Sequence, residues 1–161
     1  MHHTYSVHAI RQPNRNDCWA ACGAMLLGLS GQEGVNTVKE RARAAGVRTV
    51  VFGHNAGGIQ PGSVPQLASA LGLSLRDCRN ESLTGDVLNT VLGRGPAAAF
   101  GAINYPGADS STMHVLMFTG ANGPDANPTI RFIDPYTARR FDYPMAEFNE
   151  ALGSVDYFLY R

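Results

Sequence analysis

The sequence is short of charge, of cysteine and of long apolar runs. Charged residues make up 16% of its 161 residues, and 13 basic side chains balance 13 acidic ones. Such a balance produces no overall field that attracts nucleic acid or an anionic membrane surface. No stretch approaches the run of about 18 apolar residues that a membrane-spanning helix requires. We therefore expect neither a nucleic acid nor a membrane among the partners.

Cysteine is also scarce, and its spacing excludes a disulfide framework. The three cysteines, Cys18, Cys22 and Cys78, cannot all pair with one another. They are typical of reduced thiols in a reducing compartment. The first residues, "MHHTYSVHAIRQ", lack the apolar centre of a signal peptide, so we expect no signal peptide and synthesis in a cytoplasm.

No internal repeat or low-complexity linker divides the chain. Its hydrophobic fraction is 44%, which is typical of a folded protein, and its length suits one domain with a proper core. We therefore predict a single domain over residues 1–161.

The two halves of the chain have different patterns. The front half predicts a helix from Cys18 to Leu29 that is apolar nearly all round, ended by "SGQEG", and an amphipathic helix from Val35 to Ala45. Ser63 is expected to cap a short helix, "VPQLASALG", and Thr84 or Ser82 lies near the start of another, Leu83–Leu92.

From Pro96 onward, short β-rich runs alternate with turn residues. The predicted strands are "PAAAFGAI", "MHVLMFTGA", "TIRFIDPY", "ARRFDY" and "VDYFLYR", with a short helix, "PMAEFNEALG", before the last. Helices first and an antiparallel sheet afterwards indicate the α+β class, not a doubly wound fold.

A zinc site is the first chemistry that the cysteines suggest. Cys18 and Cys22 would share a helix face, and Cys78, His54 and His114 are available elsewhere. Structural zinc sites usually present two closely spaced ligand pairs, and no second pair occurs here. We therefore expect no metal and no other cofactor. "GHNAGGI" lacks the lysine of a phosphate loop, and "GLSGQ" is one glycine short of a serine nucleophile motif.

A cysteine nucleophile fits the pattern better. Cysteine catalysis needs a thiolate near neutral pH, and the partial positive charge at a helix start favours one. Cys18 lies where the helix signals begin, behind the polar turn "NRND". His114 begins one predicted strand and Asp134 ends the next, so neighbouring antiparallel strands would bring both to one edge of the sheet.

Gln12 supplies a further element of such a site. An oxyanion needs fixed donors, and the Cys18 backbone N–H and the Gln12 side-chain amide could provide them. Each residue alone has a simpler explanation, since most buried cysteines only pack and most Asp-Pro pairs form turns. The hypothesis depends on glutamine, cysteine, histidine and aspartate occurring together in this order.

The interval from Gln12 to "CWAA" resembles the glutamine-to-cysteine segment of papain-like cysteine proteases. The similarity extends to the bacterial avirulence-type effector proteases of that class. It is carried by the segments "DCWAACGAML", "GIQPGSVPQLASALGL", "RGPAAAF", "HVLMFTG", "FIDPYTARR" and "YPMAEFNEAL". The resemblance runs from Gln12 to Tyr160 and implies a minimal papain-like fold, in which a cysteine-bearing helix packs on the antiparallel sheet.

The resemblance also implies a role for each site residue. Cys18 would be the nucleophile, His114 the general base and then acid, Asp134 the residue that orients His114, and Gln12 part of the oxyanion hole. Asp17 departs from the small residue that papain has before its cysteine. A carboxylate facing a thiolate would oppose it, so we expect Asp17 to point to solvent or to cap the helix.

The function implied is a cysteine peptidase that cleaves a protein or peptide. The same residues could instead deamidate glutamine, transfer acyl groups or cleave isopeptide bonds, and an inactive peptide-binding domain is the alternative from another class. The resemblance further implies a bacterial effector or toxin module, secreted into a target cell, with an immunity protein as a partner. His54, in the loop "FGHNAGGIQPGS", is expected to be exposed.

Overall fold

The structure is a computed structural model that describes residues 1–53, 55–103 and 113–161. Its sheet strands are β1 (His2–Thr4), β2 (Ser74–Asp77), β3 (Ala97–Ile103), β4 (His114–Asn122), β5 (Thr129–Asp134), β6 (Arg139–Pro144) and β7 (Gly153–Tyr160). Its helices are α1 (Cys18–Leu27), α2 (Gly31–Ala44), α3 (Val64–Leu71), α4 (Gly85–Leu92) and α5 (Met145–Ala151), and a 3₁₀ turn, η1 (Pro61–Ser63), precedes α3. No described helix is long and apolar enough to cross a membrane.

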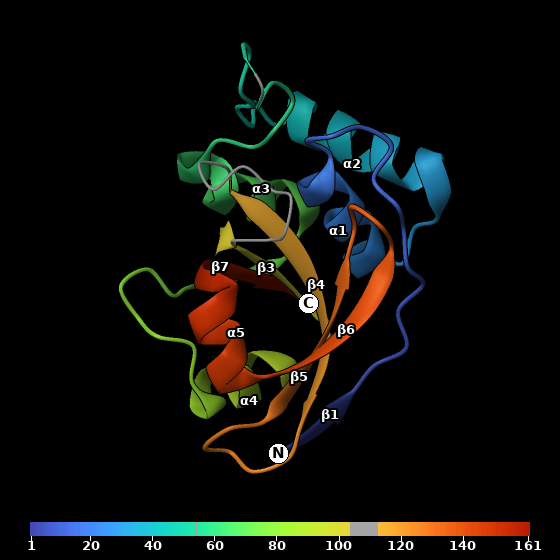
Figure 1. Cartoon of the computed structure of the whole chain (residues 1–161). Coiled ribbons are helices and arrows are strands. Elements are labelled where there is room, and N and C mark those ends of the chain that lie inside the picture. The colour runs from blue at the N-terminus through green and yellow to red at the C-terminus, as the bar shows by residue number, and fades with distance from the viewer. Residues whose placement is uncertain (54, 104–112) are drawn as a thin grey trace.

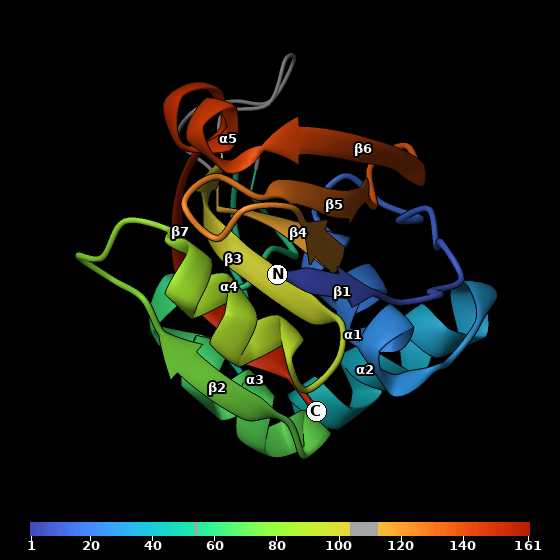
Figure 2. The same cartoon turned by 90° about the horizontal axis from the view of Figure 1, so that it is seen from below.

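All strands belong to one antiparallel sheet, with the order β2-β7-β3-β4-β5-β6. β1 pairs with the far end of β4, beyond the point where β3 begins. Figure 2 shows β3, β4, β5 and β6 side by side. The predicted α+β class with a C-terminal antiparallel sheet is confirmed.

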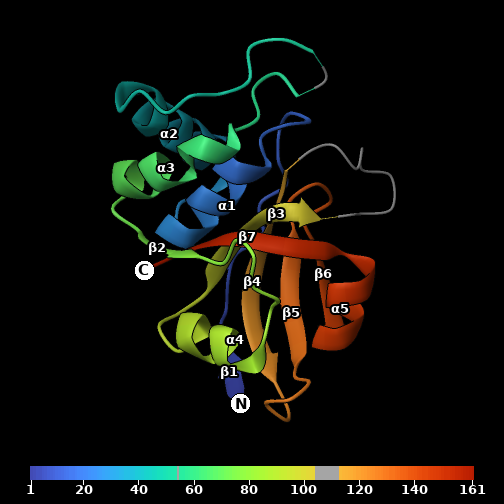
Figure 3. The same ribbon diagram turned by 90° about the vertical axis from the view of Figure 1, so that its left-hand side faces the viewer.

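Helices cover both faces of this sheet. One apolar cluster joins α1, α2 and α3 to one face, and the other joins α4 and α5 to the opposite face. Figures 1 and 3 show α1–α3 gathered at one end of the molecule and α4 and α5 at the other. Neighbouring residues of a strand therefore enter different clusters, as in β4, where Val115 faces α1 and Leu116 faces away.

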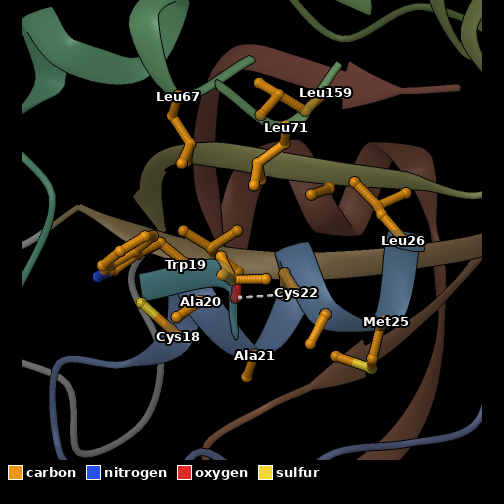
Figure 4. Packing of buried hydrophobic residues seen from close by; sticks show 14 of the residues in the cluster. Cys18, Trp19, Ala20, Ala21, Cys22, Met25, Leu26, Leu67, Leu71 and Leu159 are labelled. Atoms are coloured by element: carbon orange, nitrogen blue, oxygen red, sulfur yellow. Dashed lines mark hydrogen bonds between the residues drawn. The ribbon is translucent and has the colours of Figure 1, made fainter. Parts of the chain in front are cut away.

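Helix α1 lies at the centre of the first cluster. Every residue from Cys18 to Leu26 is buried, which explains why the sequence is apolar all round. Gly28 adopts the left-handed conformation (φ 69°) that ends the helix, because its N–H reaches back to the last carbonyls. Figure 4 shows α1 packed against Leu67 and Leu71 of α3 and Leu159 of β7.

Helix α2 begins four residues before the predicted start at Val35. Ser30 is its N-cap, and two of its first four residues are glycines, which disfavour a helix in isolation. Gly34 is required by packing, because a Cβ at this position would lie 2.9 Å from Leu29 Cβ. The close approach of the loop after α1 therefore favours glycine over a better helix former.

Several local predictions need correction. Ser63 is the N-cap of α3, but its side chain makes no capping hydrogen bond, because the η1 turn leads directly into the helix. Of Thr84 and Ser82, both expected near the start of α4, Thr84 is the N-cap. It accepts a hydrogen bond from Val87 N at 3.3 Å, and the helix begins at Gly85 and not Leu83. The short strands β1 and β2 were not predicted.

Candidate active site

Cys18 is the first residue of α1 and is 7% exposed. Its helix contacts β4 and β3, so the start of α1 lies against the sheet. The N-terminus of a helix carries partial positive charge, which favours a negative group at this position. The sequence prediction of the cysteine at a helix start is thus confirmed by the backbone.

His114 and Asp134 lie on neighbouring strands, at the strand ends that share one end of the sheet. His114 begins β4 and Asp134 ends β5, and the two strands are antiparallel neighbours. His114 Nε2 lies 2.9 Å from Asp134 Oδ1, and the ring also makes a side-chain hydrogen bond with Cys18. Since Nε2 contacts Asp134, Nδ1 is the ring nitrogen left for Cys18. The three predicted residues therefore meet, with histidine in the middle.

Asp134 is fully buried, and its carboxylate is held by hydrogen bonds. Oδ1 also accepts a hydrogen bond from the Tyr136 backbone N–H at 3.0 Å. A carboxylate held in this way keeps the imidazole in one orientation.

The charge state of His114 follows from these contacts. Burial lowers its pKa, but the hydrogen bonds with Asp134 and Cys18, together with the negative charges of these residues, raise it to about 10. These contacts therefore favour the charged form of the His114 ring. An imidazolium beside a cysteine sulfur is the arrangement that stabilises a thiolate.

Gln12 is buried in the segment that leads to Cys18. Its backbone N–H donates to Pro135 O at 2.7 Å, which ties this segment to the turn after Asp134. Its side-chain Nε2 donates to Asn14 O at 2.9 Å and Arg15 O at 2.5 Å. Its buried Oε1 has no hydrogen-bond partner among the described residues. The structure thus places Gln12 near the site, with its amide bound to the loop before Cys18.

The expectation that the Asp17 side chain points to solvent or caps the helix is wrong. Asp17 occupies the N-cap position of α1, but its side chain makes no capping hydrogen bond and is 2% exposed. Its Oδ1 accepts from Lys39 Nζ at 3.0 Å and its Oδ2 from Asn14 Nδ2 at 2.8 Å. The carboxylate is therefore buried with a countercharge instead of facing water.

Trp19 and Cys22 have structural positions next to the site. Trp19 Nε1 donates to Gly57 O at 3.0 Å, which fixes the following loop against α1. Cys22 is fully buried one helical turn after Cys18, as Figure 4 shows, and its Sγ lies 3.7 Å from Val115 O. Burial raises the pKa of the Cys22 thiol well above its ordinary value, with added contributions from Cys18 and Asp134. Burial and the raised pKa both disfavour the Cys22 thiolate.

All three cysteines are free thiols. Among the described residues, no three His, Cys, Asp or Glu side chains are grouped as a metal ion would require. His54, which we considered as a ligand and expected to be exposed, lies outside the described residues.

A cysteine at the start of a buried helix, packed on an antiparallel sheet that presents histidine and aspartate, defines a papain-like cysteine protease. The model of one such family, described as papain-like cysteine protease AvrRpt2, matches residues 1–153 of the 161, so the chain belongs to this family. A search of curated proteins finds no match. The predicted resemblance, fold and enzyme class are confirmed, and a protease of this kind acts on a protein substrate.

Proposed function

We propose that the protein cleaves a peptide bond through a triad of Cys18, His114 and Asp134. The observation that carries the proposal is the position of His114 between the other two, 2.9 Å from the Asp134 carboxylate and hydrogen-bonded to Cys18. Its raised pKa, about 10, supports a thiolate–imidazolium pair in the resting enzyme.

In the proposed mechanism, the Cys18 sulfur attacks the carbonyl carbon of the substrate amide and forms a C–S bond. The C=O electron pair moves to oxygen, and the oxyanion is stabilised by the Cys18 backbone N–H and by Gln12. The C–N bond then breaks as His114 donates its proton to the leaving amine. His114 next takes a proton from water, which attacks the thioester and releases the acid and the cysteine.

The role proposed for Gln12 requires one adjustment. Both of its amide N–H groups are directed at loop carbonyls, those of Asn14 and Arg15. We propose that one of them turns to the oxyanion as charge develops there, since a charged acceptor forms a stronger hydrogen bond than a neutral carbonyl.

The test compares the intact protein with Cys18→Ala by terminal-residue proteomics of a target-cell lysate. We expect new termini only with the intact protein, and a loss of turnover of about 10⁴-fold or more in the variant. Cys78→Ala is the matched control, because it removes a buried cysteine from the other apolar cluster and should keep turnover. New termini with Cys18→Ala would overturn the nucleophile assignment.

The same experiment separates the alternative reactions. A mass gain characteristic of deamidation, without new termini, would replace the peptidase reaction with a deamidase, and a new covalent adduct would indicate acyl transfer. Specific substrate binding without any reaction would indicate an inactive domain.

We also propose that the protein is a bacterial effector delivered into a target cell, or a toxin module that an immunity protein neutralises. Support for this part is the family membership alone. Expression of the intact protein inside candidate host cells, compared with Cys18→Ala, tests it, and equal survival and equal proteomes would contradict it.

A further inference from the structure

A second buried carboxylate belongs to the residue that directly precedes the proposed nucleophile. Asp17 precedes Cys18 in the chain and is 2% exposed. A negative charge at this position would oppose a thiolate on Cys18. Burial without a partner would also be costly for the carboxylate itself. The site therefore requires something that compensates the Asp17 charge.

Lys39 supplies that compensation from another helix. It lies on α2, and its Nζ is 3.0 Å from Asp17 Oδ1. The Lys39 side chain is 38% exposed, so its ammonium keeps contact with water while it pairs with a buried oxygen. The pair joins the start of α1 to the middle of α2.

The contact continues from Asp17 to Gln12 through Asn14. Asn14 Nδ2 donates to Asp17 Oδ2 at 2.8 Å, and Asn14 O accepts from the Asp17 backbone N–H at 3.2 Å. The same Asn14 carbonyl accepts from Gln12 Nε2 at 2.9 Å. A continuous chain of polar contacts thus runs from Lys39 to the proposed oxyanion-hole residue.

Two pairs of oppositely charged groups come from the elements that hold Cys18 and its neighbours. His114 comes from β4 and Asp134 from β5, and these two form their own contact. Asp17 comes from the turn before α1 and Lys39 from α2. Each of these two buried carboxylates therefore has one partner that can carry a positive charge, and loss of Lys39 would leave the Asp17 charge without one.

We propose that Asp17 and Lys39 are positioning residues of the site. Their ion pair fixes the Gln12–Cys18 segment and cancels the carboxylate charge next to the nucleophile. The proposal rests on the proposed function for its effect on turnover. Its effect on the reactivity of the Cys18 thiol can be measured without any substrate.

The test measures alkylation of Cys18 by iodoacetamide between about pH 5 and 9, with peptide mapping to identify the labelled cysteine. Burial raises the pKa of the Cys22 and Cys78 thiols, whereas Cys18 is hydrogen-bonded to His114, so Cys18 is expected to react first. Lys39→Met should slow its alkylation about tenfold near pH 6.5 and shift the pH profile upward, because the Asp17 charge is left without its partner.

The matched variants separate charge from structure. Lys39→Arg keeps the charge and should recover most of the rate. The double variant Asp17→Asn, Lys39→Met removes both charges and should return to within about threefold of the wild-type rate. Arg43→Met removes a positive charge from an exposed position on the same helix, where its partner is Glu40, and should change nothing.

Asp17→Asn alone gives a prediction of opposite sign. It removes the negative charge of the residue next to Cys18 and keeps the Lys39 charge, so the pH profile should move downward, and this holds even if Lys39→Met fails to fold. An unchanged profile in both single variants, or a double variant slower than Lys39→Met, would overturn the proposal while leaving the triad intact. A wild-type Cys18 that shows no selective alkylation would overturn both.

Discussion

At the scale of single residues, the histidine is the group whose chemistry the contacts define best. His114 is 14% exposed at its side chain and lies between a buried carboxylate and a sulfur. Burial disfavours its charge, yet its partners raise the pKa to about 10. Cys18 and Asp134 together therefore favour the charged form of the ring. Removing either partner should lower the pKa of His114.

The first prediction concerns that dependence. Cys18→Ala removes a hydrogen bond and a negative charge that both raise the pKa of His114, so this pKa should fall below its value of about 10. Titration of the His114 ring by NMR in both proteins measures the difference. Equal pKa values would mean that the sulfur and the ring do not interact in solution.

A linked effect on stability follows from the sign of this shift. The folded state raises the pKa of His114 above its ordinary value of about 6.5, so the charged ring stabilises the fold fully below that pH. This contribution disappears as the pH rises towards about 10. The free energy of unfolding can be measured in urea for the wild type and for His114→Asn. The stability advantage of the wild type over the variant should therefore decrease across this pH range. A constant difference would contradict the assignment.

The second prediction separates the two cysteines of α1. Cys22→Ser places a hydroxyl group where the thiol has its contact with Val115 O, at 3.7 Å, which is long for a hydroxyl hydrogen bond. Burial of a poorly bonded hydroxyl should lower the free energy of unfolding by about 1–3 kcal/mol. Turnover and Cys18 alkylation of the folded fraction should stay near wild type. A large loss of turnover with normal stability would assign Cys22 a chemical role.

The sequence could predict that Cys18, His114 and Asp134 come together, because each lies at a recognisable point of an element. Cys18 follows a polar turn, and His114 and Asp134 lie at the two strand ends that antiparallel pairing brings together. The burial of Asp17 could not be predicted. Its partner Lys39 is 22 positions away on another helix, and nothing local indicates that contact.

At the scale of elements, the structure differs from the predictions where tertiary contacts override local preference. Helix α2 includes Gly31 and Gly34, which weaken a helix in isolation, and this is why its start was predicted too late. β1 and β2 have only three and four residues, and each gains its structure from pairing with a longer strand, β4 or β7. Long strands such as β4 were predicted because burial on both faces makes them continuously apolar.

The third prediction tests the close approach at Gly34. Glycine to alanine usually stabilises a helix by about 1 kcal/mol. Here the new Cβ would lie 2.9 Å from Leu29 Cβ and 3.2 Å from the Leu29 backbone carbon, so α2 must move. We expect Gly34→Ala to destabilise the protein by about 1–3 kcal/mol in urea unfolding.

Gly62→Ala is the matched control, because no atom lies within 4 Å of its new Cβ. It should change stability by about 0.5 kcal/mol or less. Since α2 also carries Lys39, Gly34→Ala should slow Cys18 alkylation as well. A stabilising effect of Gly34→Ala would show that α1 and α2 are packed more loosely than the structure indicates.

At the scale of the whole molecule, the sheet separates the candidate site from a second core. Cys18 and α1 pack on one face, whereas Phe118, Phe132, Phe148 and Phe158 gather on the other. The ring of Phe148 in α5 makes edge contacts with Phe118 at 5.5 Å and Phe132 at 5.9 Å between centroids. The sequence pattern marks these residues as apolar but does not reveal which face each helix covers.

The last prediction asks whether residues 1–161 unfold as one unit. Phe148 is fully buried and belongs to the face away from Cys18, so Phe148→Ala should cost about 3–5 kcal/mol of stability through the cavity it leaves. Because β3, β4, β5 and β7 contribute residues to both cores, we expect this loss of stability to reach the face of the sheet that carries Cys18 as well.

The measurement compares two unfolding transitions in urea. In the wild type, the midpoint at which Cys18 becomes accessible to iodoacetamide should equal the midpoint of the circular dichroism signal, and both midpoints should fall together in the variant. Without urea, alkylation of the folded variant should match wild type, since no contact of the site has changed. Two separate midpoints would show that α1–α3 and the sheet with α4 and α5 unfold independently, and the single-domain prediction would then be wrong.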